Sequence, residues 1–128
     1  MRIAGIGFRA SADLASLQDA LRLALADAGN PKLDALVTEA AKSREAVFRE
    51  LAQLLKLPGL GVSQNDIAGM ITPTQSERIQ DQFGTGSLAE ATALAAAGPD
   101  ADLIACRAVS GDGKATAAIA RSERMTPA

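Results

Sequence analysis

The chain has 128 residues, and its 13 lysines and arginines nearly balance its 15 aspartates and glutamates, for a formal net charge of -2. Hydrophobic residues make up 48% and aromatic residues only 2%. This composition suffices for a buried core, but it offers neither the positive charge nor the stacking rings of nucleic-acid-binding proteins. We therefore exclude a nucleic-acid partner.

Histidine is absent, and cysteine occurs once, at Cys106. The absence of histidine excludes Ser-His-Asp and Cys-His catalysis and histidine-bound metal. A single cysteine excludes an internal disulfide. Cys106 stands beside Arg107, which fits a thiol of lowered pKa, but a small buried hydrophobe is the commoner role. The carboxylates are not spaced like a metal cage, so we predict neither a metal nor a cofactor.

The first residues enter a strand pattern at once, without the charged region, apolar run and cleavage site of a secretory signal. No apolar stretch approaches the roughly 20 residues that a membrane helix needs. We therefore expect a cytoplasmic protein with no membrane partner.

The first half of the chain alternates strand and helix patterns. Residues 3–8 predict a buried strand, and residues 14–28 predict a helix capped by Ser11 or Asp13. Residues 36–38 predict a second strand, and a helix capped by Ser43 follows to residue 55. Residues 60–62 predict a short third strand.

The second half predicts a helical turn at residues 67–71 and a short helix at residues 76–83. Ser87 and Glu90 form a capping-box pattern at the start of an alanine-rich helix that ends at residue 97. Residues 103–109 and 115–120 predict a terminal hairpin.

Strands that alternate with helices and end in a hairpin predict an α/β fold of three layers, α/β/α. The sheet is expected to be mixed and mostly parallel, with about five strands and a C-terminal antiparallel hairpin. We expect one domain over residues 1–121 and a flexible tail over residues 122–128. Ligands of such sheets bind beyond the carboxyl ends of parallel strands, which places the loop at residues 7–11 in the candidate site.

The run at residues 5–10 matches the G-x-G-x-x-A pattern of dinucleotide-binding loops. A tight strand-to-helix turn that needs glycine is the simpler interpretation, and we favour it. The run at residues 84–87, Gly-Thr-Gly-Ser, opens a capped helix. One interpretation is that its exposed backbone amides hold a carboxylate or a phosphate. The other is that the run is only a loop followed by a helix N-cap.

Three charged residues lie on or between the predicted elements. Lys42 and Glu45 lie between a strand and a helix, where such a pair usually means a surface salt bridge. Arg107 lies on an apolar strand, where an arginine needs a partner.

Four segments occur in a fixed order: Gly-Ile-Gly-x-Arg, Thr-x-x-x-Lys-x-x-Glu, Gly-Thr-Gly-Ser-Leu-Ala-Glu-Ala and Ala-Thr-Ala-Ala-Ile-Ala-Arg. Together, over residues 2–121, they resemble CobE and the C-terminal domain of CbiG. The resemblance marks as ligand-binding Gly5, Gly7, Arg9, Lys42, Glu45, Gly84, Gly86, Ser87 and Glu90, with Arg107 where the family favours lysine. Phe8 and Ala10 depart from the family, which commonly has a cysteine and a second basic residue there.

The resemblance implies a role in cobalamin (vitamin B12) biosynthesis, in which the chain binds or handles a precorrin, a tetrapyrrole intermediate of the aerobic pathway. CbiG-type proteins open a lactone on cobalt-precorrin-5A, so an enzyme acting on precorrin-5A or precorrin-6A is an alternative, with Lys42 or Glu45 transferring protons. A third possibility is a docking partner of a pathway methyltransferase that uses an exposed face of the alanine-rich helix.

Overall fold

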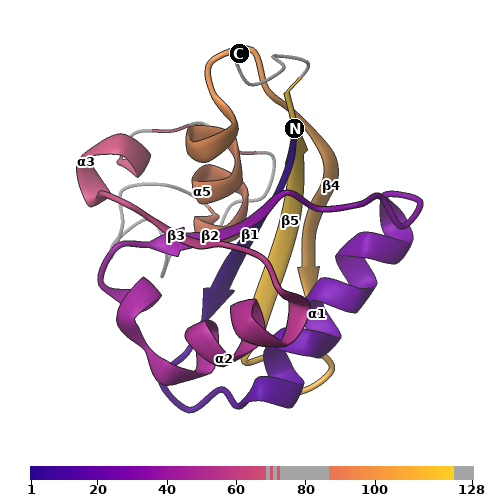
Figure 1. Ribbon diagram of the computed structural model, residues 1–128, viewed down its shortest axis with the longest axis vertical. Helices are drawn as coiled ribbons and strands as arrows, with labels where there is room; N and C mark the ends of the chain where they lie inside the picture. Colours follow the sequence, from indigo (N-terminus) through magenta and orange to yellow (C-terminus); the bar gives the residue numbers. More distant parts are fainter. Residues whose placement is uncertain (69, 71, 73–86, 123–128) are drawn as a thin grey trace.

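Five strands, β1 (Arg2–Phe8), β2 (Ala35–Glu39), β3 (Gly59–Val62), β4 (Asp102–Val109) and β5 (Ala115–Arg121), form a mixed sheet in the order β3-β2-β1-β5-β4 (Figure 1). The computed structural model describes residues 1–68, 70, 72 and 87–122. β1 pairs in parallel with β2, and β2 pairs in parallel with β3, whereas β5 is antiparallel to both β1 and β4. Four of the five strands therefore point the same way, which confirms the predicted mixed, mostly parallel sheet with a C-terminal hairpin.

Helices cover both faces of the sheet, as the three-layer prediction requires. α1 (Leu14–Asp27) and α2 (Ala46–Leu55), which follows the short helix η1 (Lys42–Arg44), pack on one face. α5 (Leu88–Ala97) and the single-turn α3 (Gln64–Ile67) pack on the other. Among the described residues, every helix is too short or too polar to cross a lipid bilayer.

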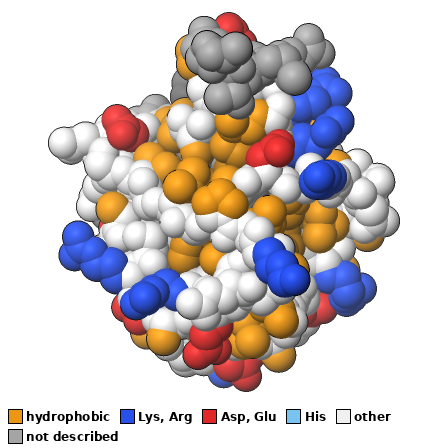
Figure 2. Space-filling view, viewed as in Figure 1, with side chains coloured by type: hydrophobic (Ala, Val, Ile, Leu, Met, Phe, Trp, Pro, Cys, Tyr) orange, Lys and Arg blue, Asp and Glu red, His pale blue; other side chains and the backbone are white. Residues whose placement is uncertain are grey.

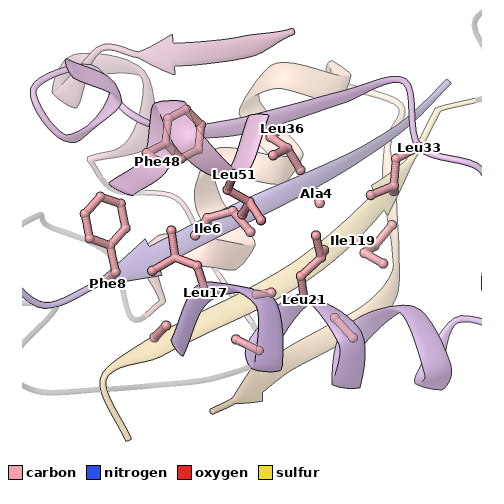
Figure 3. Packing of buried hydrophobic residues seen from close by; sticks show 14 of the residues in the cluster. Ala4, Ile6, Phe8, Leu17, Leu21, Leu33, Leu36, Phe48, Leu51 and Ile119 are labelled. Atoms are coloured by element: carbon pink, nitrogen blue, oxygen red, sulfur yellow. The ribbon is translucent and has the colours of Figure 1, made fainter. Parts of the chain in front are cut away.

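The core under α1 and α2 is built from branched and aromatic side chains. Ile6, Leu17, Phe48, Leu51 and Ile119 are almost completely buried and point toward one another from β1, α1, α2 and β5 (Figure 3). Each buried side chain of this size contributes roughly 1.5–3 kcal/mol of transfer free energy, so this cluster anchors both helices to the sheet.

The core under α5 mixes alanines with larger side chains, namely Ile3, Val37, Val62, Ile67 and Leu88. The helix also lies very close to β1 at one glycine of that strand. A Cβ atom on Gly5 would overlap the carbonyl oxygen of Ala89 and lie 2.7 Å from the Thr92 hydroxyl. A Cβ atom on Gly7 would lie 3.7 Å from the Ala89 amide nitrogen. Gly5 thus permits close helix packing, whereas the tightest neighbour of a Cβ atom on Gly7 would be the Thr116 hydroxyl oxygen of β5, at 2.6 Å. Both glycines lie inside β1, so the prediction of a glycine-dependent strand-to-helix turn is wrong.

Several local predictions are confirmed. Asp13, one of the two caps proposed, accepts a hydrogen bond from the Ser16 amide at 2.9 Å at the start of α1. β3 and α5 also lie where the sequence predicts them. The predicted helix at residues 76–83 falls outside the described residues.

Other local predictions need correction. Ser43 does not cap α2, because the N-cap of this helix is Glu45. The Ser43 hydroxyl instead donates to the Ala40 carbonyl at 2.6 Å. The helical turn expected at residues 67–71 lies earlier, in α3, because Ser63 caps it. The exposed face expected on α5 is narrow, because Leu94, Ala95 and Ala96 are partly buried and the other residues of the helix are buried. Docking of a methyltransferase on this helix stays a prediction. Ser122, placed in the predicted tail, is buried, and its amide donates to the Met1 carbonyl at 2.9 Å.

We expect the substitution Gly5→Ala to destabilise the protein by about 1–3 kcal/mol or more, because the added methyl group has to displace the backbone of α5. Gly111→Ala is a matched control, since its Cβ would meet only the Asp19 carboxylate, at an ordinary 3.5 Å. Urea unfolding of both variants measures the difference. A Gly5→Ala variant within about 0.5 kcal/mol of the parent would show that α5 does not pack as described.

Candidate functional site

The carboxyl ends of β1, β2 and β4 lie at one end of the molecule, together with the first turn of α5. The first turn of α5 is placed there because Leu88 and Ala89 lie beside Gly7, near the end of β1. The hairpin turn between β4 and β5 closes the same end, where the Arg9 amide donates to the Lys114 carbonyl at 2.9 Å. The predicted site residues are distributed over these elements.

Arg9 follows β1 directly and is exposed, with its backbone fixed by the hydrogen bond to Lys114. In the part of the chain that the structure describes, the ion pair present is the one between Arg22 and Asp19, so the Arg9 guanidinium has no carboxylate partner there. The Arg9 backbone is therefore fixed by a hydrogen bond, while its charged side chain is accessible to a ligand.

Lys42 reaches across from η1 to the end of β1. Its Nζ donates to the Phe8 carbonyl at 2.7 Å and lies 4.8 Å from the centroid of the Phe8 ring. Glu45 is exposed at the N-cap of α2. Within the described residues, no ion pair joins Lys42 to Glu45, so the predicted surface salt bridge is not formed.

Glu90 is completely buried in the first turn of α5, although it is ionisable. Its Oε2 accepts a hydrogen bond from the Arg107 amide at 2.9 Å. The pairing of β4 with β5 shifts register between Ala105 and Ala108, which leaves the intervening amide available to a side chain. Glu90 thus ties the irregular part of β4 to α5.

Ser87 caps α5 as predicted, since its hydroxyl oxygen accepts from the Glu90 amide at 3.3 Å. The reciprocal half of the capping box differs from the prediction, because the Glu90 carboxylate accepts from Arg107, a residue of β4. Gly84 and Gly86, the other two members of this motif, lie outside the described residues.

Arg107 is half-buried on β4, and its own side chain makes no ion pair within the described residues. The adjacent Cys106 is exposed, so its predicted role as a buried hydrophobe is wrong. Partial burial raises the pKa of its thiol, and the Glu90 carboxylate adds to the effect, so the alternative of an activated thiol is wrong as well.

The structure therefore brings the predicted residues together in two groups. Arg9 and Lys42 lie at the end of β1, and Ser87, Glu90 and Arg107 lie where α5 meets β4. Gly5 and Gly7 lie between the groups, in the packed interior. Among the described residues, no three histidine, cysteine, aspartate or glutamate side chains are grouped so as to hold a metal ion.

Two buried polar residues at the end of β2 have roles that the sequence reasoning did not predict, although Thr38 belongs to the Thr-x-x-x-Lys-x-x-Glu segment. The Thr38 hydroxyl donates to the Ile6 carbonyl at 2.7 Å, and both carboxylate oxygens of Glu39 accept from the Ala41 amide, at 3.0 and 2.9 Å. The available signal was a polar pair that directly follows an apolar strand. These bonds fix the turn that carries Lys42.

A cluster of hydroxyls and carboxylates joins the hairpin turn to α1. The Asp112 carboxylate accepts hydrogen bonds from the hydroxyls of Ser110, at 2.6 Å, and Ser16, at 2.5 Å, and from the Lys114 amide, at 3.0 Å. These bonds, that from Ser110 first, lower the pKa of Asp112 to about 2. The Gly111 amide likewise donates to Asp19 at 2.7 Å, so the hairpin that holds Arg9 is itself held by α1.

The comparisons with known proteins agree on one pathway. The family model described as cobalamin synthesis G C-terminus matches residues 2–120. The solved structure of CobE, a protein from the cobalamin (vitamin B12) biosynthetic pathway, is similar at 30% identity and a TM-score of 0.84, over 95% of this chain and 90% of that chain. A search of the curated proteins found no match.

Two further structures are similar. The cobalamin biosynthesis protein chiG from Agrobacterium tumefaciens matches at 34% identity and a TM-score of 0.71, over 96% of this chain and 99% of that chain. A homolog of cobalamin biosynthesis protein G from Sulfolobus solfataricus shares 17% identity and has a TM-score of 0.70. That match covers 97% of this chain but only 37% of that chain, and it shows the fold alone.

The Asp112 cluster predicts a loss of stability in acid. Because folding lowers this pKa from 3.8 to about 2, the unfolded chain binds the proton first as the pH falls. The stability that the cluster contributes is therefore fully present above about pH 4 and is lost progressively toward about pH 2. The lowered pKa values of Asp13 and Asp19 act in the same direction.

Urea unfolding at about pH 5 and about pH 3 measures this loss, which we expect to be smaller in Asp112→Asn than in the parent. Asp102→Asn, which removes an exposed carboxylate from β4, is the control and should keep the parent's pH dependence. Equal losses in all three proteins would show that Asp112 is not held by the serine hydroxyls in solution.

Proposed function

The chain belongs to the family of the cobalamin synthesis G C-terminus, and from this membership we propose that it binds and handles a precorrin during cobalamin biosynthesis, in the aerobic route. The observation that carries the proposal is the placement of Arg9, Lys42 and Arg107 near the carboxyl ends of three strands that point the same way. In open sheets of this kind, that end is where ligands bind.

The chemistry of a precorrin suits these residues. Its ring is large, flat and apolar and is edged with carboxylates, so it favours a site with apolar surface and a few cations near the rim. Arg9 is exposed and Arg107 half-exposed, and neither guanidinium forms an ion pair within the described residues. Both guanidinium groups can therefore bind a carboxylate without first losing a protein partner.

Lys42 contributes differently. Its ammonium already contacts the Phe8 carbonyl and ring, so it acts as a positive charge held at the end of β1. A ligand carboxylate near β1 would interact with a charge whose position is set before binding, which reduces the entropy cost of ordering the side chain.

A visible-spectrum titration with metal-free precorrin pigments, followed by mass analysis of the pigment, tests the proposal. A spectral shift with unchanged mass is the expected result. A changed mass would identify an enzyme acting on precorrin-5A or precorrin-6A, and no shift with any pigment would overturn the proposal.

We expect Arg9→Ala and Arg107→Ala each to weaken pigment binding about tenfold or more, because each removes a charge-assisted hydrogen bond. Their unfolding midpoints should stay near that of the parent, since neither guanidinium forms an ion pair in the described structure. Arg22→Ala, on α1, is the control for the loss of one positive charge. Binding that is equally weakened in all three variants would indicate only a general charge effect.

We expect Lys42→Met to weaken both pigment binding and folding. The substitution leaves the Phe8 carbonyl without its donor, which costs about 1–3 kcal/mol for a part-buried acceptor. Urea unfolding and the same spectral titration measure the two effects. A variant that binds weakly at full stability would show that the lysine contacts only the ligand.

A further inference from the structure

The outer edge of β3 is an open edge of the sheet. β3 is the last strand in the order, and within the described residues nothing pairs with its far side. The amides of Leu36 and Ala40 donate to the carbonyls of Pro58 and Val62, so the even-numbered residues of β3 face β2. Gly59 and Gly61 therefore direct their N–H and C=O groups away from the sheet, and both are exposed.

This edge is short, at four residues, but it lacks the other features by which proteins usually block strand addition. These are charged side chains, internal prolines and bulges. The opposite edge strand, β4, has two register shifts in its pairing with β5. β3 pairs with β2 in unbroken register and consists of two glycines, a leucine and a valine, with the Leu60 side chain 42% exposed.

A groove of about 310 Å³ runs beside this edge, between β3 and α2. Its apolar lining comes from Phe48, Ala52 and Leu57, and its positive charges come from Arg49 and Lys56. No carboxylate lines it, and neither cation forms an ion pair within the described part of the chain. An occupant that places negative charge over an apolar strip complements this surface.

The face that carries β3 is apolar at its centre and charged around it. Figure 2 shows hydrophobic side chains gathered across its middle, with Lys and Arg side chains, and some Asp and Glu side chains, at its margins.

We propose that the outer edge of β3 binds an extended acidic segment of a partner protein, which adds to the sheet as a further strand. The backbone groups of Gly59 and Gly61 supply the hydrogen bonds, and alternate side chains of the segment enter the groove beside Arg49 and Lys56. A second copy of this chain is a poorer fit, because pairing two such edges would bring like charges together. The proposal does not depend on precorrin binding, which involves the carboxyl ends of the strands.

A synthetic peptide in which glutamate alternates with valine is the probe. We expect its addition to shift the NMR amide signals of residues 59–62 and to slow hydrogen exchange at Gly59 and Gly61. A peptide of the same length with lysine in place of glutamate should bind more weakly. A glutamate peptide methylated at alternate backbone nitrogens, which cannot donate to the edge, should not bind.

Two variants keep the test independent of folding. Lys56 ends α2 with φ 56°, a left-handed conformation that glycine adopts more readily, so Lys56→Gly should fold at least as well as the parent. It should bind the peptide roughly two- to fivefold more weakly, the usual effect of removing one exposed charge pair. Leu60→Glu should abolish binding, whereas Leu23→Glu, at an exposed leucine of α1, should not.

Three outcomes would overturn the proposal. These are shifts centred on Arg9 and Arg107, no shift at any amide, and equal binding of the methylated peptide. Sedimentation of the protein without peptide measures whether it forms a dimer. If it does, and if dimer formation shifts the same amide signals of residues 59–62, the edge binds a second copy of the chain and the proposal is overturned.

Discussion

The contact of α5 with β1 at Gly5 is the constraint on which the rest of the molecule depends. The helix backbone lies so close to the strand that no Cβ atom fits between them. Ala91 and Ala93 of α5, and Ala118 and Ala120 of β5, are completely buried and belong to the same small-residue layer. Alanines therefore cover much of the sheet beside α5, while Phe48 and most of the buried leucines lie on the other face.

The short distance between α5 and the sheet determines where Glu90 lies. With α5 close to the sheet, the side chain of Glu90 reaches the Arg107 amide on β4. A carboxylate in the first turn is favoured by the helix dipole, and its hydrogen bond offsets part of the cost of burying it.

The sequence predicts the elements well because they depend on local periodicity and local caps. The apolar spacing in α1 and the serine at the start of α5 act over one or two turns, and both elements lie where they were expected. The predictions that were wrong depend on contacts distant in sequence. Gly5 was assigned to a turn because α5, which packs on it, follows more than 80 residues later.

The candidate site, too, has features that depend on local sequence and features that depend on contacts distant in sequence. The types of residue, cations between strands and helices, can be read from the sequence and from the family resemblance. Their partners cannot, because Lys42 contacts a carbonyl of β1, and Asp112 accepts from Ser16 of α1 across 96 positions. Cys106 is exposed on β4 where the pairing with β5 shifts register, and no local sequence pattern reports that shift.

The contacts of Lys42 also bear on whether the chain binds or transforms its ligand. Both the hydrogen bond to the Phe8 carbonyl and the position over the Phe8 ring are made by the charged ammonium. A proton acceptor at this position would have to be neutral, which would remove the cation–π attraction to the Phe8 ring and weaken the hydrogen bond to the Phe8 carbonyl. Phe8 stands where the family commonly has a cysteine, so this chain has an aromatic support for the cation in place of a thiol. These contacts support binding and handling over proton transfer by Lys42.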